Sequence, residues 1–473
     1  MALLSIYNWI NSDLKSHLET LGIKTRPNAS SGLWVCLLLP ACLCATVLRL
    51  PTSETFILTA ACSLGLCLAS LLVLVFPNNI AKGHLKNWHG WLIPAILTIL
   101  LHWSLLQRGL LFSMLTEVTI SLGFKHTLSF VLRNCSLSFT IGEALLVVQS
   151  IVLFVYSALL NIHTSWKLTP TDKYDVITLI LQVGLLTTML IVINLFRMQV
   201  TMDLSRFILT VGGHLTAMVG ILHILLRQSS IVWMLNFVLD DSNKVWMVIY
   251  WAIASAFGGI AVAGQIFAGA RATTSHRKTF HILATIVFLT GYIYECNLIY
   301  LASGLALAVL IALETLRKLR IGSVSVFLNE GFELFADEKD AGGLSLTPMY
   351  LLIGMACPLA LRPNSCSSAS LLTAVSGILS VGIGDTCASY YGSHYGKTIW
   401  AGSCKSVEGT VANMAAQFIT LYCLSYFGFI ESSLRVTVVC VAAVITNSTI
   451  EAKTDQVDNL TLPLITYLVL LLA

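Results

Sequence analysis

The chain has 473 residues, of which 56% are hydrophobic and only 11% are charged, and its formal net charge is +4. A soluble globular domain carries about 25% charged residues, so a soluble protein with this composition would lack the polar surface to cover its apolar residues. The composition therefore excludes an ordinary soluble protein and makes lipid the solvent for most of the chain. The small net charge does not indicate a nucleic-acid partner, and we expect none.

Apolar segments recur along the whole chain at lengths that suit membrane-spanning helices. Each such helix needs about 20 mostly apolar residues, so we expect an all-α polytopic membrane protein with about 13–15 spans. The segment 109–131 fits either an interfacial helix or a further span. The candidate spans are 32–50, 55–76, 90–107, 139–160, 175–196, 207–226, 245–268, 280–297, 298–316, 348–361, 369–389, 409–427, 434–450 and 460–473.

The connections between these spans change in character near residue 245. Before it they are short and chemically plain; after it, four are rich in charged, Gly, Ser and Thr residues, namely 271–279, 317–347, 390–408 and 451–459. We therefore predict an N-terminal membrane region, 1–245, whose role the sequence does not indicate, and a C-terminal region, 246–473, that carries the chemistry. Two spans separate each consecutive pair of polar connections, so all four should meet on one face. Their Lys and Arg content makes that face cytoplasmic by the positive-inside rule.

The most informative motif is Gly382-Ile-Gly-Asp385, at the end of an apolar segment. Glycine allows close backbone approach, and a carboxylate in or beside a membrane helix is costly and usually functional. The structural alternative is a capped helix end in a tightly packed bundle. The Gly-x-Gly pair also matches part of a dinucleotide fingerprint, but that fingerprint needs a βαβ unit, whereas these surroundings predict membrane helix.

Two further loop segments follow Asp385. The stretch Gly392-Ser-His-Tyr-Gly-Lys-Thr398 has three residues between its glycines where a P-loop has four, and no strand precedes it, so we do not expect a Walker fold. Its backbone N–H groups and Lys397 are nevertheless suited to phosphate. The second stretch brings Lys405 and Glu408 to the entry of the next span, where an ordinary charged interfacial loop is the alternative.

The remaining polar connections carry three charged clusters. Before the span that starts near residue 280, the basic cluster and His281 either take part in chemistry or only mark topology. The acidic stretch 335–342 either holds Mg²⁺ or solvates a loop. The last connection is unusually dense in charge for a segment next to a final span. The residues concerned are Arg277, Lys278 and His281 in the first cluster, Asp340 in the second, and Glu451, Lys453, Asp455, Asp458 and Asn459 in the third.

The order and spacing of these motifs resemble the nucleotide-binding signature of the dolichol kinase family, over about residues 270–473. The similar segments are Gly382-Ile-Gly-Asp-Thr-Cys-Ala-Ser389, the Gly392 and Gly396 pair, Lys405-Ser-Val-Glu-Gly-Thr410, Arg277-Lys-Thr-Phe-His281, Asp340-Ala-Gly342 and Asp458-Asn-Leu-Thr-Leu-Pro463. Polyprenol and phytol kinases and phosphatidate cytidylyltransferases share parts of the signature, but the long N-terminal membrane region favours dolichol kinase. One loop departs from the family's common Pro-Gly-Thr-Lys-Lys-Thr: here Ala401 and Cys404 replace the Pro and one Lys, while Lys405 is kept.

The resemblance implies an endoplasmic reticulum enzyme that transfers the γ-phosphate of CTP to dolichol or a related polyprenol. The products would be CDP and dolichyl phosphate, a lipid carrier for protein glycosylation, and Mg²⁺ or another divalent cation would accompany CTP. We expect catalytic roles for Asp385, His281 and Glu408, and metal ligands among Asp385, Asp340 and Asp455. The expected CTP-binding residues are Arg277, Lys278, Gly382, Gly384, Ser393, His394, Tyr395, Gly396, Lys397, Thr398, Ile399, Trp400, Ala401, Gly402, Ser403, Cys404, Lys405, Ser406, Val407 and Glu408.

Two other classes of protein remain as alternatives. A cytidylyltransferase that makes a CDP-lipid would use a similar CTP site, but it would attack the α-phosphate and release pyrophosphate. A transporter would show inverted repeats and helices interrupted in mid-membrane, and the sequence shows neither. The preferred prenol length, the oligomeric state and the identity of the general base do not follow from the sequence.

Overall fold

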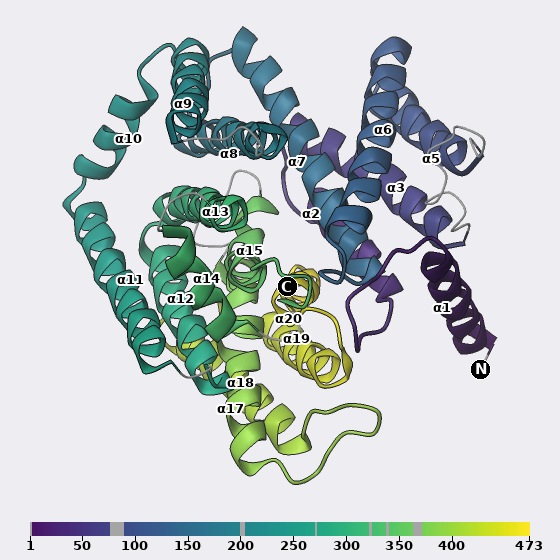
Figure 1. The fold of residues 1–473 in the computed structure, drawn as a ribbon, viewed down its shortest axis with the longest axis vertical. Helices are drawn as coiled ribbons and strands as arrows, with labels where there is room; N and C mark the ends of the chain where they lie inside the picture. Colours follow the sequence, from purple (N-terminus) through teal and green to yellow (C-terminus); the bar gives the residue numbers. More distant parts are fainter. Residues whose placement is uncertain are drawn as a thin grey trace. The chain divides into compact units, whose positions relative to one another are not determined.

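The computed structural model describes residues 2–75, 89–198, 204–269, 272–320, 324–336, 340–362 and 371–473. Within these ranges every regular element is a helix, as Figure 1 shows, and the only strand-like feature is an isolated antiparallel bridge between Ile399 and Ser406. The all-α prediction is therefore confirmed. Arg271 and residues 337–339, which belong to the first two polar connections, lie outside the described residues.

Seven helices in the described ranges are long and apolar enough to cross a membrane, which makes the chain a polytopic membrane protein. The ambiguous segment 109–131 forms one helix, Leu110–Asn134, which is not among the seven. The predicted total of about 13–15 spans also counted shorter and more polar segments, and that total stays a prediction. The seven are Glu54–Leu74, Ile141–Lys167, Lys173–Met198, Ser205–Leu226, Ser242–Ala268, Cys296–Leu319 and Leu434–Lys453; shorter apolar helices are Leu33–Arg49, Ile93–Ser104, Ser230–Leu239, Thr347–Ala360 and Asp458–Leu470.

The chain forms two compact units, and the first contains most of the N-terminal third. Unit 1 comprises Met1–Ser157, Asp337–Leu344 and Asp455–Val457. In it, α3 packs against α2, α5 and α6. The functional division that we predict at residue 245 stays a prediction. The helices of unit 1 are α1 (Ala2–Thr20), η1 (Leu33–Leu37), α2 (Leu38–Arg49), α3 (Glu54–Val75), α5 (His89–Leu100), η3 (Leu101–Leu105), α6 (Leu110–Asn134) and the first part of α7 (Ile141–Lys167).

Unit 2 comprises Ala158–Ala336, Ser345–Thr454 and Asp458–Ala473, and its helices share one apolar core. Around that core, η7 contacts α12, α18 and α20, and α18 and α20 both contact α19. Its helices are α8 (Lys173–Met198), α9 (Leu204–Leu226), α10 (Ser230–Leu239), α11 (Ser242–Ala268), α12 (Thr274–Tyr294), α13 (Cys296–Leu319), α14 (Val324–Phe335), α15 (Thr347–Ala360), α16 (Leu371–Ala374), η7 (Ile378–Asp385), α17 (Thr386–Tyr395), α18 (Val407–Tyr426), α19 (Leu434–Lys453) and α20 (Asp458–Leu470).

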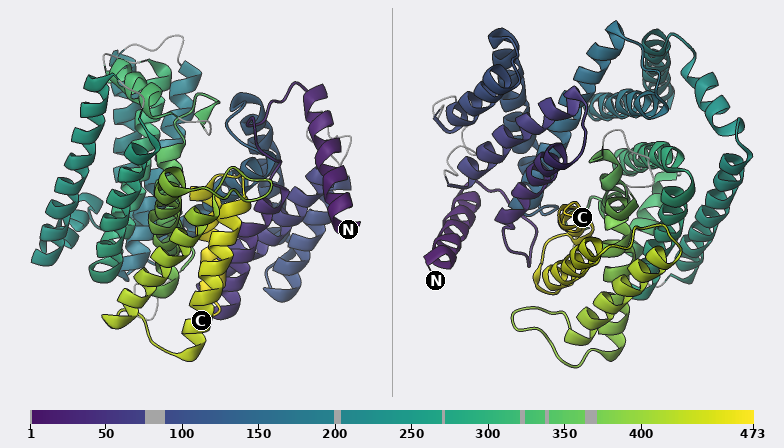
Figure 2. Two further views of the ribbon diagram at one scale, coloured as in Figure 1. Left: turned by 90° about the horizontal axis from the view of Figure 1, so that it is seen from below. Right: turned by 180° about the vertical axis from the view of Figure 1, so that it is seen from behind.

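In unit 2, two of the polar connections lie next to each other at the start of α12 and the end of α14. The start of α12 receives the end of α14, since the Ala272 N–H donates to the Leu334 carbonyl at 2.9 Å and the rings of Phe280 and Phe335 lie 5.6 Å apart. The helices α17 and α18 lie side by side, and the loop that joins them extends away from their ends, in Figures 1 and 2. The contacts described below bring this loop to α19 and α20.

Candidate active site

The first half of the site joins the start of α12 to the end of η7. Because Lys278 and His281 are three residues apart, they project from one face of α12. The Lys278 ammonium donates to Oδ2 of Asp385, and Nε2 of His281 lies 3.8 Å from the same oxygen. All three side chains are largely withdrawn from solvent. A buried carboxylate thus shares one oxygen between a cation and an imidazole.

The glycines before Asp385 allow this arrangement. A Cβ on Gly382 would collide with the Thr285 hydroxyl of α12, and a Cβ on Gly384 would lie 2.6 Å from Oδ1 of Asn413 in α18 and 2.8 Å from the Leu379 carbonyl. Residues Ile378–Asp385 also form a π-helix, which is rare and often found at functional sites. The structure therefore explains both glycines by close packing, and direct contact between them and CTP stays a prediction.

The second half of the site is built on the loop before α18. Residues 398–407 form a short hairpin, because the Trp400 N–H donates to the Lys405 carbonyl at 3.0 Å and the Val407 N–H donates to the Thr398 carbonyl at 2.8 Å. Gly402 supplies the turn with a φ of +75°, which suits glycine. The Ser406 hydroxyl then accepts from the Gly409 N–H at 3.1 Å and caps α18.

The hairpin delivers Lys405 to two acids at the facing ends of α19 and α20. Its Nζ lies 2.6 Å from Oε1 of Glu451 and 2.8 Å from the Glu451 carbonyl, and 3.5 Å from Oδ2 of Asp458. Burial alone would lower the pKa of Lys405, but the carboxylates of Asp458 and Glu451 outweigh it and raise that pKa above its ordinary value. Lys405 is therefore a permanent cation.

The two halves form one electrostatic cluster. Lys278 pairs with Asp385, and Lys405 pairs with Glu451 and Asp458, so two ammonium groups face three carboxylates. The buried Oε2 of Glu451 has no hydrogen-bond partner among the described residues. An unsatisfied buried carboxylate oxygen is costly, so this cluster has the capacity to bind a further cation.

Glu408 has a different task from the other acids. Its carboxylate accepts from the backbone N–H groups of Lys397, at 3.1 Å, and Thr398, at 3.2 Å, and so closes the base of the hairpin. Hydrogen bonds from its own N–H and from those of Thr398 and Lys397 hold the pKa of Glu408 below its ordinary value. The structure shows a loop-shaping role for this side chain, and its catalytic role stays a prediction.

The rest of the predicted CTP-binding segment lies on the surface beside this cluster. Residues 393–399 are exposed, and no described residue pairs with the ammonium of Lys397. The Trp400 side chain is held in place, because its indole N–H donates to the Thr410 hydroxyl at 2.9 Å and the Lys453 ammonium lies over its ring. The segment therefore offers backbone N–H groups and a free cation next to a fixed aromatic ring.

Two of the three predicted metal ligands belong to unit 1, whereas the cluster belongs to unit 2, and their role as metal ligands stays a prediction. Asp340 and Asp455 belong to unit 1, and the Asp455 carboxylate accepts from the backbone N–H of Ser30 at 2.7 Å and from its hydroxyl at 2.8 Å. The described residues contain no group of three or more His, Cys, Asp or Glu side chains arranged around a metal.

Glu451 and Asp458, the acids that bind Lys405, could not be assigned roles from the sequence. The signal was present in the charge density beside the final span. Which of those charges face the loop depends on how α19 and α20 pack, and no spacing rule predicts that.

Comparison with known proteins identifies the family of the chain. The family model described as dolichol kinase matches residues 104–456, a stretch that contains Lys278, His281, Asp385, Lys405 and Glu451. The chain belongs to the dolichol kinase family. It is thus an enzyme, a membrane-embedded lipid kinase of the phosphotransferase class, and neither a cytidylyltransferase nor a transporter is favoured.

Curated relatives of this dolichol kinase family member come from animals and plants. The chain is 33% identical over 387 residues to the dolichol kinase of Mus musculus. The matched stretch covers 78% of this chain and 70% of that protein. It is 32% identical over 387 residues to the dolichol kinase of Homo sapiens, and that match again covers 78% of this chain and 70% of that protein. It is 37% identical over 205 residues to dolichol kinase EVAN of Arabidopsis thaliana, covering 41% of this chain and 35% of that protein. No solved structure matches the chain.

Proposed function

We propose that this lipid kinase transfers the γ-phosphate of CTP to the terminal hydroxyl of dolichol, giving dolichyl phosphate and CDP. The observation that carries the proposal is the single cluster in which Lys278 and Lys405, from separate polar connections, share three carboxylates beside an exposed, glycine-containing loop. A nucleoside triphosphate brings about four negative charges, and phosphoryl transfer depends mainly on positioning and charge stabilisation. The choice of cytosine over another base rests on the family.

In the nucleotide complex the lysines exchange partners. Phosphate oxygens replace the carboxylates as acceptors for Lys278 and Lys405, while Lys397 and Arg277, at the edge of the cluster, add positive charge. The backbone N–H groups of the loop 393–408 contribute further donors. One or two of the carboxylates would then be free to hold a cation together with the phosphates, which would keep the site close to charge balance.

The residues fit a magnesium ion with few protein ligands. Mg²⁺ in kinases is bound by one or two carboxylates together with substrate phosphates, and the open Oε2 of Glu451 and the Asp385 carboxylate provide such ligands. When bound, the ion neutralises charge that develops on the phosphates.

His281 is the proton acceptor that the geometry favours. Its Nε2 faces Oδ2 of Asp385 at 3.8 Å, and its Nδ1 lies 3.4 Å from the Arg277 carbonyl. As the prenol oxygen bonds to the γ-phosphorus and the bond to the β-phosphate oxygen breaks, the hydroxyl proton passes to Nε2. Asp385 then stabilises the imidazolium, and the proton is later lost to water.

The acceptor lipid explains the membrane setting. Dolichol cannot leave the bilayer, so its hydroxyl must reach a face where CTP is dissolved while its tail stays among the helices. We place the enzyme in the endoplasmic reticulum membrane with the cluster on the cytoplasmic face, where CTP is made and where Lys and Arg of the polar connections concentrate. In this scheme residues 246–473 carry the chemistry and residues 1–245 support it.

The test uses membranes from cells that express the chain, supplied with polyprenol and CTP labelled on either the γ- or the α-phosphate. The proposal predicts lipid-phase label only from γ-labelled CTP, with release of CDP. Lipid label from α-labelled CTP with release of pyrophosphate would instead make the protein a cytidylyltransferase. An excess of unlabelled ATP that removes the label would refute the assignment of CTP as donor.

A further inference from the structure

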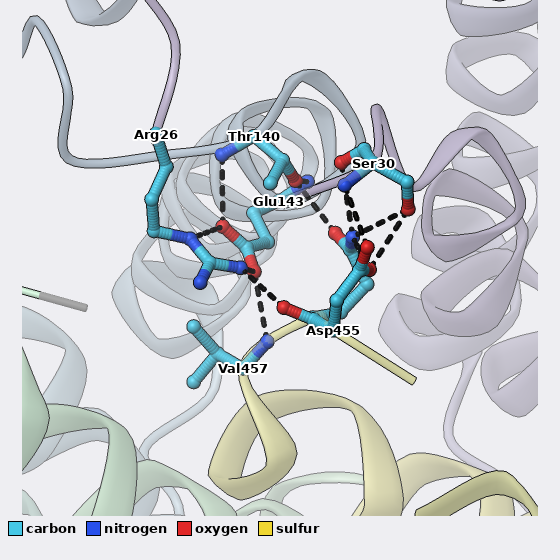
Figure 3. Close-up of polar contacts among 7 residues, drawn as sticks. Arg26, Ser30, Thr140, Glu143, Asp455 and Val457 are labelled. Carbon is cyan, nitrogen blue, oxygen red and sulfur yellow. Dashed lines mark hydrogen bonds and ion pairs between the residues drawn. The ribbon is translucent and has the colours of Figure 1, made fainter. Parts of the chain in front are cut away.

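A second polar network lies in unit 1, at the point where the chain passes between α19 and α20. At its centre, Arg26 and Glu143 form a buried ion pair, with Nη2 2.7 Å from Oε1 and Nε 3.3 Å from Oε2 (Figure 3). The Thr140 N–H donates to Oε2 of Glu143 at 2.8 Å. Glu143 is fully buried, so this carboxylate is held by donors and does not face solvent.

The same network forms hydrogen bonds with all three residues of the segment Asp455–Val457. Arg26 Nη2 donates to the Asp455 carbonyl at 2.9 Å, and the Val457 N–H donates to Oε1 of Glu143 at 2.8 Å. The Asp455 carboxylate accepts from the N–H and the hydroxyl of Ser30, as Figure 3 shows. Between them, Gln456 donates to the Ser30 carbonyl at 3.1 Å.

This segment is joined by covalent bonds to the acids that bind Lys405. Glu451 lies in the last turn of α19, four residues before Asp455, and Val457 is bonded directly to Asp458, the first residue of α20. Three extended residues span at most about 11 Å. Fixing Asp455–Val457 therefore restricts where the end of α19 and the start of α20 can lie.

A buried ion pair is a poor device for stability alone. Well-packed apolar side chains of similar volume often serve as well or better, and the best-attested use of buried polar groups is to specify one arrangement. Here Arg26 donates to the Asp455 carbonyl and Glu143 accepts from the Val457 N–H, so both members of the pair bind backbone groups of the connection. Fixing the position of the connection requires such contacts.

We propose that Arg26, Ser30 and Glu143 are positioning residues: they fix the α19–α20 connection and thereby set Glu451 and Asp458 around Lys405. The inference rests on the proposed role of Lys405 in binding the phosphates of CTP. It gives the N-terminal membrane region a task in nucleotide binding.

The first test is Asp455→Ala, which removes the bonds to Ser30 but leaves every member of the cluster intact. We expect the KM for CTP to rise about tenfold, the equivalent of about 1.4 kcal/mol, while the KM for polyprenol and the yield of monodisperse protein stay unchanged. The matched control is Asp241→Ala, which removes a comparable hydrogen bond at the start of α11, where the Asn243 N–H donates to Oδ1 of Asp241 at 2.9 Å. The control should change both KM values less than twofold.

The second test asks whether the effect passes through Lys405. In a Lys405→Ala background, Asp455→Ala should add no further rise in the KM for CTP, because neighbouring groups that act through one contact are not additive. Multiplying effects would overturn the proposal. So would a loss of activity that follows the loss of protein in both Asp455→Ala and the milder Ser30→Ala. A wild-type chain that labels no lipid from CTP would overturn the proposed function itself, before any variant is compared.

Discussion

Lys405→Ala is the variant that most directly tests the phosphate cluster. Lys405 is the cation shared by Glu451 and Asp458, and the hairpin that carries it has backbone hydrogen bonds of its own, which the substitution leaves in place. The change should therefore remove a charge without removing the loop.

Two effects follow from its contacts, and they differ in size. A hydrogen bond to a charged group contributes about 1.5–3 kcal/mol, so loss of the bond to phosphate should lower kcat/KM for CTP about 10- to 150-fold. Loss of the ion pair leaves the carboxylates of Glu451 and Asp458 uncompensated. The Lys405 side chain is 30% exposed, but those of Glu451 and Asp458 are only 4% and 10% exposed, so solvent screens the two acids little. The stability cost should therefore lie between the roughly 1 kcal/mol of an exposed pair and the roughly 3–5 kcal/mol of a buried pair that loses one partner.

The assay measures kcat and KM for CTP and for polyprenol on purified protein, with thermal unfolding as the stability readout. Lys167→Ala is the control, because Lys167 is an exposed lysine at the end of α7, and it should leave all four values near those of the wild type. A raised KM for polyprenol with an unchanged KM for CTP would refute the phosphate role of Lys405.

Three further predictions follow from the same contacts. Asp385→Asn should abolish lipid labelling while the protein still inserts and accumulates; near-normal turnover of the purified variant would remove Asp385 from the mechanism. Gly384→Ala should cost about 1–3 kcal/mol through overpacking, whereas Gly123→Ala, where a Cβ meets nothing within 4 Å, should be neutral or stabilising by about 0.4–1 kcal/mol; equal melting temperatures would contradict the packing explanation. Single cysteines can replace Ser275, Ser403 and Thr454 in a background without reactive cysteines. All three should react with an impermeant thiol reagent in sealed microsomes with the cytoplasmic face outward. A position that reacts only after permeabilisation would disprove the shared face.

The sequence by itself determined the class of fold and the place of the chemistry. Only helices and closed barrels satisfy backbone hydrogen bonds in lipid, so long apolar segments without strand periodicity led to an all-α membrane protein. Costly charges beside such segments pointed to Lys278, Asp385 and Lys405, because a membrane protein rarely places unneeded charges there. These three residues do join one cluster in the structure.

Tertiary structure alone decided which acids meet which cations. Asp455 and Asp458 are three residues apart, and the sequence gives no reason to prefer one of them, yet Asp455 is bound to Ser30, about 425 residues away, while Asp458 faces Lys405. Likewise, Gly384 is suited by composition to a ligand loop, but it is required by the side chains of α18. The physical reason is that a helix's period fixes which residues share a face, whereas the neighbour that covers each face is fixed by packing among segments far apart in the chain.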